Sequence, residues 1–126
     1  MSQDVVADAL NMIKNAKKAG KENITIKKIS NLLIEILKIM KQKEAIKRYK
    51  INGKDKSIEI KIGDITECKA IKPRFRCNLE QIEKYRRRYL PSRKIGNLII
   101  STNRGLMTHE EAQEEKRGGF LIAFFY

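Results

Sequence analysis

The sequence contains few of the residues that build zinc sites or disulfide frameworks. In 126 residues there are two cysteines, one histidine and no tryptophan. Cys68 and Cys77 lack the Cys-x-x-Cys spacing, and His109 alone cannot complete the four ligands of a structural zinc site. We therefore expect no metal centre and two reduced thiols in an intracellular protein.

Long hydrophobic runs are also missing. No apolar stretch reaches the roughly 18–20 residues that a membrane span needs. The first residues include Asp4 and Asp8 and lack the basic and apolar segments of a signal peptide. The sequence thus predicts a soluble, cytoplasmic protein with no membrane partner.

Motifs for nucleotide binding and metal-dependent hydrolysis do not occur. The chain has no GxGxxG, no GxxxxGK[ST] and no HExxH pattern. A hydrolase interpretation remains open, with His109 as a general base near Glu110, Glu111 and Ser101, but the first turn of a helix is a simpler place for these glutamates. We expect no catalytic residue, no cofactor and no small-molecule substrate.

What the sequence has in abundance is positive charge. Lys and Arg number 28 against 15 Asp and Glu, for a formal charge of +13, and both halves carry an excess. Positive charges in this excess repel one another, and a protein that carries them usually binds a polyanion, with nucleic acid the leading candidate. Because 41% of the residues are hydrophobic, the charge belongs to the surface of a folded protein, and both halves are expected to touch the partner.

Periodicity in the first half predicts helix, strand, helix, strand, strand. Ser30 is a candidate N-cap, Asp4 another, Gly20 a helix stop, and Asn52-Gly53 a hairpin turn with positive φ. The expected elements are helices at 4–19 and 32–40, strands at 24–26, 45–51 and 58–62, and a further strand at 65–71.

The second half begins where Pro73 should end a strand, so the boundary is placed at Lys72, giving domains 1–72 and 73–126. Capping boxes at 78–81 and 108–111 should open helices, with Gly118 and Gly119 ending the second. Strands are expected at 98–100 and 120–126, with a tight turn at 103–105. The fold class is α+β: two small domains, an α/β N-terminal half and a mostly β C-terminal half with short helices.

The most distinctive candidate site is the loop Ser101-Thr102-Asn103-Arg104-Gly105. It places hydroxyls, an amide, a guanidinium and a flexible glycine between a buried strand and a capped helix. Such a loop can fit an irregular RNA helix by shape, with hydroxyls at base edges, sugars or phosphates. An ordinary polar turn has the same local composition, so composition alone leaves both interpretations open.

A second candidate is the cluster Arg86-Arg87-Arg88, flanked by Tyr85 and Tyr89. The arginines suit salt-sensitive phosphate contacts, while the tyrosines lie at helical spacing with the core positions. A solvated basic face is the alternative. Arg74 and Arg93 extend the arginine-rich second half, and a comparable set of lysines surrounds the first loop: Lys17, Lys18, Lys21, Lys27 and Lys28.

Several segments resemble one known family. The block from Ser101 to Ala112, followed by Gly118-Gly119, is similar to the C-terminal signature of the universal small-subunit ribosomal protein eight family. The segments 70–75 and 89–93 resemble the archaeal and eukaryotic branch, and the ending 123–126 leans eukaryotic. The spacing of residues 8–16 fits the family's first helix, so the resemblance covers essentially the whole chain.

The resemblance implies a structural protein of the small ribosomal subunit, with two small domains, that binds a helix in the central domain of the small-subunit ribosomal RNA (rRNA) and supports assembly and translation beside neighbouring ribosomal proteins. A non-ribosomal RNA chaperone or an RNA-processing enzyme is the alternative. The positions that the resemblance assigns to RNA contact are Ser101, Thr102, Asn103, Gly105, Gly118, Gly119, Lys14, Asn15, Lys28 and Ser30.

Overall fold

The computed structural model describes residues 5–126. Contacts within the chain divide it into two compact units, one ending at Cys68 and the other covering Lys69–Tyr126. The boundary expected at Lys72 falls inside strand β4 (Cys68–Cys77). The division into two halves that both serve RNA stays a prediction.

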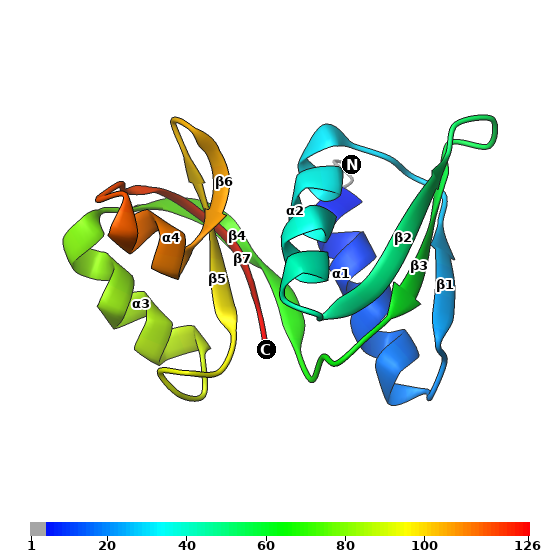
Figure 1. Ribbon diagram of the computed structural model, residues 1–126, viewed down its shortest axis with the longest axis horizontal. Helices are drawn as coiled ribbons and strands as arrows, with labels where there is room; N and C mark the ends of the chain where they lie inside the picture. The colour runs from blue at the N-terminus through cyan, green and yellow to red at the C-terminus, as the bar shows by residue number, and fades with distance from the viewer. Residues whose placement is uncertain (1–4) are drawn as a thin grey trace. The chain divides into compact units, whose positions relative to one another are not determined.

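The first unit has two helices on one face of a three-stranded sheet (Figure 1). Its elements are α1 (Val5–Lys18), β1 (Asn23–Ile26), α2 (Asn31–Gln42), β2 (Ile46–Asn52) and β3 (Ser57–Ile62). The sheet order is β1-β3-β2, and both strand pairs are antiparallel. This confirms the order helix, strand, helix, strand, strand, while the proposed cap Asp4 lies outside the described residues.

Local chemistry sets the ends of these helices. The Oγ of Ser30 accepts a hydrogen bond from the backbone N–H of Leu33 at 3.1 Å, which opens α2. Gly20 takes a φ of 77° after α1, and the N–H of Lys21 returns to the carbonyl of Ala16 at 2.9 Å. This closing turn needs the left-handed conformation that glycine adopts without strain.

The hairpin between β2 and β3 differs from the expected two-residue turn. Gly53 does not take a positive φ, and Lys56 does, at 50°. Strand β2 ends at Asn52 and β3 begins at Ser57, so the connection spans residues 53–56 and the left-handed residue stands at its end. Longer hairpin loops of this kind place their positive φ after a turn and not within it.

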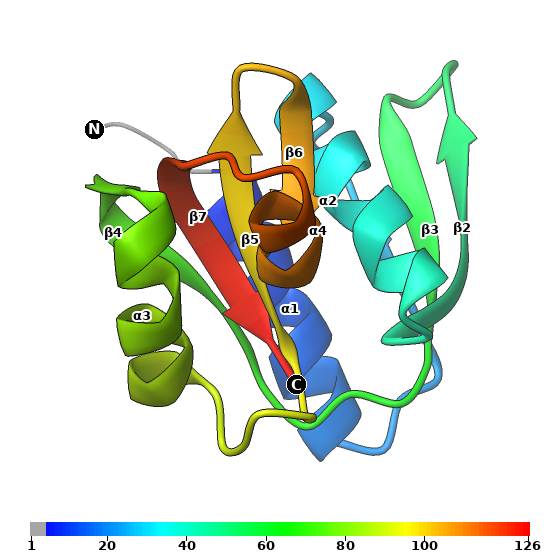
Figure 2. The ribbon, with the colours of Figure 1, turned by 60° about the vertical axis from the view of Figure 1, so that its left-hand side comes forward.

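The second unit has a four-stranded sheet with two short helices on one face (Figure 2). The sheet order is β4-β7-β5-β6. Besides β4, the elements are the 3-10 helix η1 (Leu79–Gln81), α3 (Ile82–Tyr89), β5 (Asn97–Thr102), β6 (Gly105–Thr108), α4 (His109–Glu114) and β7 (Gly119–Phe125). This agrees with the expected mixed α+β class.

Three details correct the sequence predictions. Pro73 does not end its strand, because β4 is at the edge of the sheet, where a residue without an N–H is tolerated. Strand β6, unpredicted, pairs antiparallel with β5. The turn after α4 is made by Lys116, with φ 55°, and by the N–H of Arg117 on the carbonyl of Ala112 at 2.8 Å, so Gly118 and Gly119 are not the helix stop.

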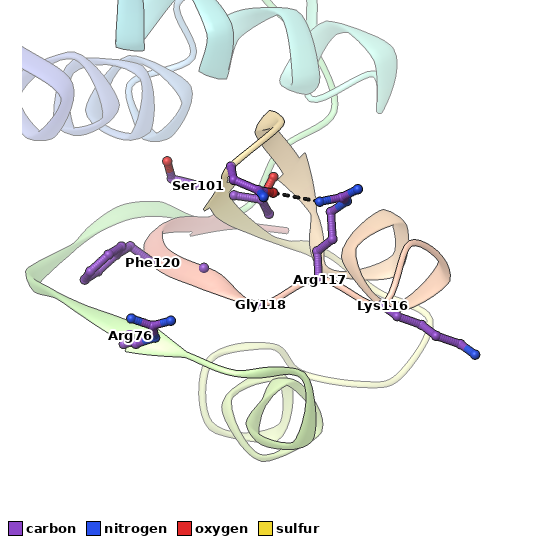
Figure 3. A pocket seen from close by; sticks show the side chains of 9 residues that line it. Arg76, Ser101, Lys116, Arg117, Gly118 and Phe120 are labelled. Atoms are coloured by element: carbon purple, nitrogen blue, oxygen red, sulfur yellow. Dashed lines mark hydrogen bonds between the residues drawn. The ribbon is translucent and has the colours of Figure 1, made fainter.

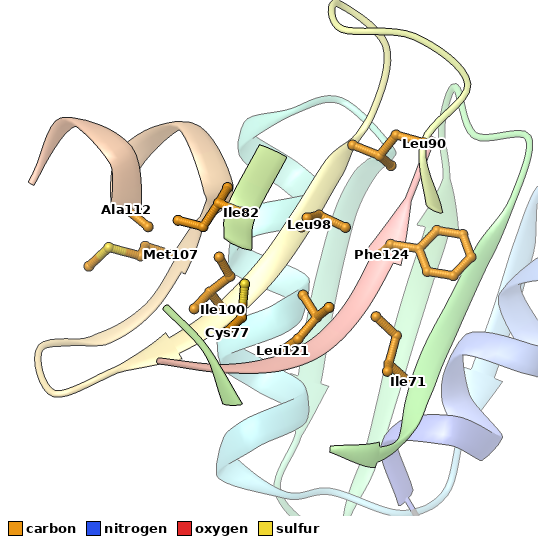
Figure 4. Packing of buried hydrophobic residues seen from close by; sticks show 10 residues of the cluster. All are labelled: Ile71, Cys77, Ile82, Leu90, Leu98, Ile100, Met107, Ala112, Leu121 and Phe124. Atoms are coloured by element: carbon orange, nitrogen blue, oxygen red, sulfur yellow. The ribbon is translucent and has the colours of Figure 1, made fainter. Parts of the chain in front are cut away.

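Every strand and both α-helices of the second unit contribute to its core (Figure 4). Leu98, Ile100 and Leu121 of the two central strands are completely buried. Both predicted capping boxes form, at Asn78 with Gln81 and at Thr108 with Glu111. The remaining members of the cluster are Ile71, Cys77, Ile82, Leu90, Met107, Ala112 and Phe124.

Candidate nucleic-acid interface

The end of the central strands in the second unit forms a hollow of about 550 Å³, which we call the Ser101 hollow. It joins the end of β5, the α4–β7 connection and the outer part of β4 (Figure 3). Its lining residues are Arg76, Ser101, Thr102, Asn103, Lys116, Arg117, Gly118, Gly119 and Phe120. Among these described residues three are cationic and none is acidic, so the hollow favours an anion.

The turn after β5 is held by its own side chains. The Oγ1 of Thr102 donates to the carbonyl of Gly105 at 2.9 Å and accepts the N–H of Arg104 at 3.1 Å. Gly105 has a φ of 106°, a conformation that residues with a Cβ rarely adopt. Arg104 and Gly105 are exposed at the tip and do not line the hollow, whereas Asn103 does.

Ser101 is half-buried near the end of the central strand β5, directly opposite Phe120 on β7 and Leu106 on β6. Gly119 precedes Phe120, and a Cβ on Gly119 would run into the carbonyl oxygen of Ser101. A Cβ on Gly118 would lie 2.9 Å from the Cα of Asn78. Both glycines therefore allow close backbone approach that sets the wall of the hollow.

The hollow brings together five predicted residues from two separate segments of the sequence. They are Ser101, Thr102 and Asn103 from one segment and Gly118 and Gly119 from the other. Sequence reasoning missed four others: Arg76, Lys116, Arg117 and Phe120. The signal available in the sequence was an aromatic residue directly after the glycine pair. In the structure Phe120 is the second residue of β7 and is 48% exposed, although the residues after it are buried. Figure 3 shows Phe120 and Arg76 projecting from strands that neighbour each other in the sheet.

Arg86 differs from the two arginines that follow it, because they are exposed. Its side chain is buried, and its Nε and Nη2 donate to the Glu83 carboxylate at 3.1 and 2.7 Å. Arg86 therefore has a structural role in α3, and RNA contact at this residue stays a prediction. The hydrogen bond from Arg86 and the charges of Arg86, Arg93 and Arg87 lower the pKa of Glu83.

The other arginines of the second unit are accessible. Arg87 and Arg93 are 70% and 76% exposed, at 3.8 and 3.5 Å from the same Glu83 carboxylate. Arg74 is exposed on β4, and Arg88 is exposed with its guanidinium carbon 5.7 Å from the ring centroid of Tyr89. Loose pairing in water costs little to break, so these four remain predicted phosphate contacts.

The tyrosines of α3 face the protein, as their spacing predicts. Tyr85 contacts Phe75 with ring centroids 4.8 Å apart, and Tyr89 contacts Phe124 at 5.2 Å. Both rings pack against the buried cluster of the second unit. They serve the core, whereas Phe120 is exposed and lines the Ser101 hollow.

The four predicted contacts of the first unit have mixed surroundings. The Nζ of Lys14 is 2.9 Å from the Glu67 carboxylate, in a half-buried ion pair. Ser30 already caps α2, while Asn15 and Lys28 are exposed. An ion pair and a cap are structural roles in their own right, and RNA contact at these four residues stays a prediction.

His109, the candidate general base of the enzyme alternative, is 2% exposed. Its Nδ1 accepts the backbone N–H of Leu98 at 3.1 Å. That nitrogen therefore holds β5 against the start of α4, which is a structural role. Glu111 fills the capping box of the same helix, so the structure gives the hydrolase interpretation no assembled site at these residues.

Across residues 5–126, no group of three His, Cys, Asp or Glu side chains is placed to hold a metal ion. No helix in that range is long and apolar enough to cross a membrane.

Two small α+β units, a formal charge of +13 and a basic, glycine-walled hollow are features that favour the class of cationic, polyanion-binding proteins. The family model for ribosomal protein S8 matches residues 4–126. The chain belongs to the ribosomal protein S8 family, which is a family of ribosomal structural proteins and not a class of enzymes.

Curated relatives come from both archaea and eukaryotes. The small ribosomal subunit protein uS8 of Nanoarchaeum equitans is 42% identical over 129 residues, with all of both chains covered. The uS8 protein of Archaeoglobus fulgidus is 38% identical, again over the full length of both. The uS8A protein of Schizosaccharomyces pombe is 36% identical over 127 residues, with 98% of each chain covered.

Proposed function

We propose that this chain is a structural constituent of the small ribosomal subunit and binds a helix in the central domain of its rRNA. The observation that carries the proposal is the Ser101 hollow, where polar groups of the β5–β6 turn lie with Arg76, Lys116 and Arg117. No acidic residue is among those that line it. Membership of the S8 family supports the ribosomal context.

The chemistry of the hollow suits an irregular RNA helix. Arg76, Lys116 and Arg117 neutralise phosphates of the RNA backbone. This electrostatic contribution to the binding free energy is strong but does not depend on the RNA sequence. Ser101 and Asn103 supply a hydroxyl and an amide for base edges or 2′-hydroxyls, which distinguish one RNA shape from another. The hollow has room for an unpaired nucleotide displaced from the helix.

Phe120 gives the hollow a stacking surface. A base that leaves an irregular helix loses the bases it was stacked on. Stacking on an aromatic ring replaces them and contributes about 1–3 kcal/mol to the binding free energy. Phe120 is 48% exposed and opposite Ser101 in the ladder, so a stacked base reaches the serine hydroxyl. Stacking and polar contact together favour an RNA with an unpaired base over a regular duplex.

The ribosomal setting is tested by fractionation of cell extracts. A tagged chain should sediment with small subunits, in the cytoplasm, and stay with them after a high-salt wash that strips loosely bound proteins. An RNA chaperone or regulator held by charge alone would be released to the top of the gradient. Failure of the full-length chain to co-sediment would contradict the proposal that rRNA and neighbouring small-subunit proteins are its partners.

A further inference from the structure

The first unit contains a basic hollow of its own, which includes Lys17 and Lys21 of the lysine set around the first loop but none of Lys14, Asn15, Lys28 and Ser30. Its volume is about 440 Å³. Four lysines from three separate parts of the chain meet there. The lining residues are Lys17, Gly20, Lys21, Glu22, Lys47, Lys61, Ile62, Gly63 and Asp64.

The backbone sets the position of this hollow. The pairing of β2 with β3 shifts between Ile46 and Arg48, which leaves Lys47 in a bulge beside the hollow. The floor is close-packed at Gly63, where a Cβ would lie 2.6 Å from the carbonyl oxygen of Glu44. The Nζ of Lys17 donates to the carbonyl of Gly63 at 2.8 Å.

A second hollow of about 280 Å³ adjoins the first at Lys61. Along β3, Glu59 and Lys61 alternate with the buried Ile60, and Arg48 and Lys50 are their partners on β2, so these charged residues share the face of the sheet away from the core. Its lining residues are Asn23, Arg48, Tyr49, Lys50, Glu59, Ile60 and Lys61. We call the two hollows together the Lys61 groove. Its cations are Lys17, Lys21, Lys47, Arg48, Lys50 and Lys61, and its carboxylates are Glu22, Glu59 and Asp64.

The strand register makes this charge costly to the protein alone. Arg48 on β2 is directly opposite Lys61 on β3. Like charges in that position repel and destabilise a sheet. Within the part of the chain that the structure describes, neither Arg48 nor Lys61 forms an ion pair with a carboxylate, although Glu22, Glu59 and Asp64 line the same groove. A bound anion would offset the repulsion between Arg48 and Lys61.

The chemistry of the groove favours a phosphate backbone over a protein partner. Ile60 and Ile62 line it but are 1% and 5% exposed, and Tyr49 is half-buried. Protein interfaces centre on exposed aromatic or aliphatic anchors, which this groove lacks among its described residues. Lysines spaced along a sheet face suit successive phosphates.

We propose that the Lys61 groove binds the phosphodiester backbone of an RNA strand, as a second contact independent of the Ser101 hollow. The proposal rests on the proposed function in assuming that the chain binds RNA. It assigns the contact of the first unit to Lys17 and Lys21, at and just after the end of α1, and to the neighbouring charged face of the sheet around Lys61. The groove neutralises phosphates and does not read bases, so its effect is equal on all RNA sequences.

The test uses the full chain with the double substitution Lys47→Gln and Lys61→Gln. The matched control, Lys43→Gln with Lys54→Gln, removes the same charge from exposed lysines of the same unit outside the groove. Affinity is measured against salt for a transcript of the rRNA central domain and for a uridine homopolymer. The groove variant should bind both RNAs on the order of tenfold more weakly at low salt, and each lost contact should lower the log–log salt slope by about 0.7–0.9.

The arginine pair Lys47→Arg and Lys61→Arg should bind as the wild type does, which separates loss of charge from a folding defect. A groove variant that behaves like the control pair overturns the proposal. The proposed function fails on a different result in the same experiment, when the wild-type chain prefers the central-domain transcript no more than the homopolymer. The two failures are therefore distinguishable.

Discussion

Arg117 donates from Nη1 to the Oδ1 of Asn103 at 2.7 Å, which joins the α4–β7 connection to the β5–β6 turn. The same guanidinium contacts the Glu115 carboxylate from Nε at 3.3 Å. Asn103 is thereby oriented by a residue fourteen positions away in the sequence. This bond unites the two walls of the Ser101 hollow.

The bond predicts coupling between the two residues in RNA binding. Asn103→Ala and Arg117→Gln should each weaken binding, and the double variant should lose about 0.5–1 kcal/mol less than the sum of the single losses. A double-mutant cycle by filter binding or fluorescence anisotropy measures the coupling. Strictly additive losses would show that the bond does not shape the bound state.

Gly119→Ala should destabilise the second unit by about 2 kcal/mol or more, because the new methyl group meets the backbone carbonyl of Ser101 and the sheet must shift. The control is Gly53→Ala, where the added Cβ meets nothing within 4 Å and φ is not positive. Urea unfolding of both variants checks this. Equal stability of the two would contradict the close approach between β7 and β5.

Phe120→Ala should weaken binding to an RNA helix with an unpaired base by about 1–3 kcal/mol. The salt slope should not change, since no charge is removed. Phe120→Tyr keeps an aromatic ring of similar shape, so this control variant should bind the RNA with the affinity of the wild type. The idea of base stacking fails if Phe120→Leu binds as tightly as Phe120→Tyr, because leucine is apolar but cannot stack as an aromatic ring does.

Burial raises the pKa of the Cys68 thiol to about 12, with a smaller contribution from the neighbouring Glu67 carboxylate. The Sγ donates to the carbonyl of Leu10 at 3.1 Å, which holds Cys68, the last residue of the first unit, against α1. Since the folded pKa is raised, the protonated thiol stabilises the fold fully below about pH 9, and this contribution is lost as the pH rises towards 12.

The stability of the wild type should therefore fall with pH above about 9 more steeply than that of Cys68→Ala. The difference in slope is about 1.4 kcal/mol per pH unit from this one group. Denaturant unfolding at several pH values compares the two, and lysine and tyrosine titrations affect both alike. Parallel pH profiles would mean that the thiol ionises in the folded protein as freely as in the unfolded one.

The sequence was sufficient for features set by local patterns. The caps at Ser30, Asn78 and Thr108 each follow from a polar residue placed before an apolar periodic segment, and all three form. The central strand β7 was expected from its unbroken apolar run, because only a strand buried on both faces tolerates such a run. These features depend on neighbours in the chain.

Features that depend on tertiary neighbours were not accessible. Whether Arg86 or Arg87 faces solvent depends on the rotation of α3 against the sheet, and only Arg86 is buried beside Glu83. Arg76 joins the Ser101 hollow through the sheet order, in which β4 is next to β7. Strand β6 is too short to show a period of two, and Pro73 is compatible with a strand only because β4 forms an edge.

The proposed RNA contacts are of two kinds, which single substitutions can separate. Arg87→Ala removes an exposed charge and should weaken binding to all RNAs alike while lowering the salt slope. Ser101→Ala removes a hydroxyl in the hollow and should reduce only the preference for the specific RNA. Equal losses from both variants on specific and unrelated RNA would refute this division.

The most direct test is a salt-titrated binding measurement of the wild-type chain on three RNAs: a central-domain helix of the small-subunit rRNA, the same helix regularised to a perfect duplex, and an unrelated hairpin. The account predicts a strong preference for the irregular native helix that persists at high salt, because the Ser101 hollow recognises shape. Equal and steeply salt-dependent binding to all three would show that charge alone holds the RNA, and would contradict the central claim.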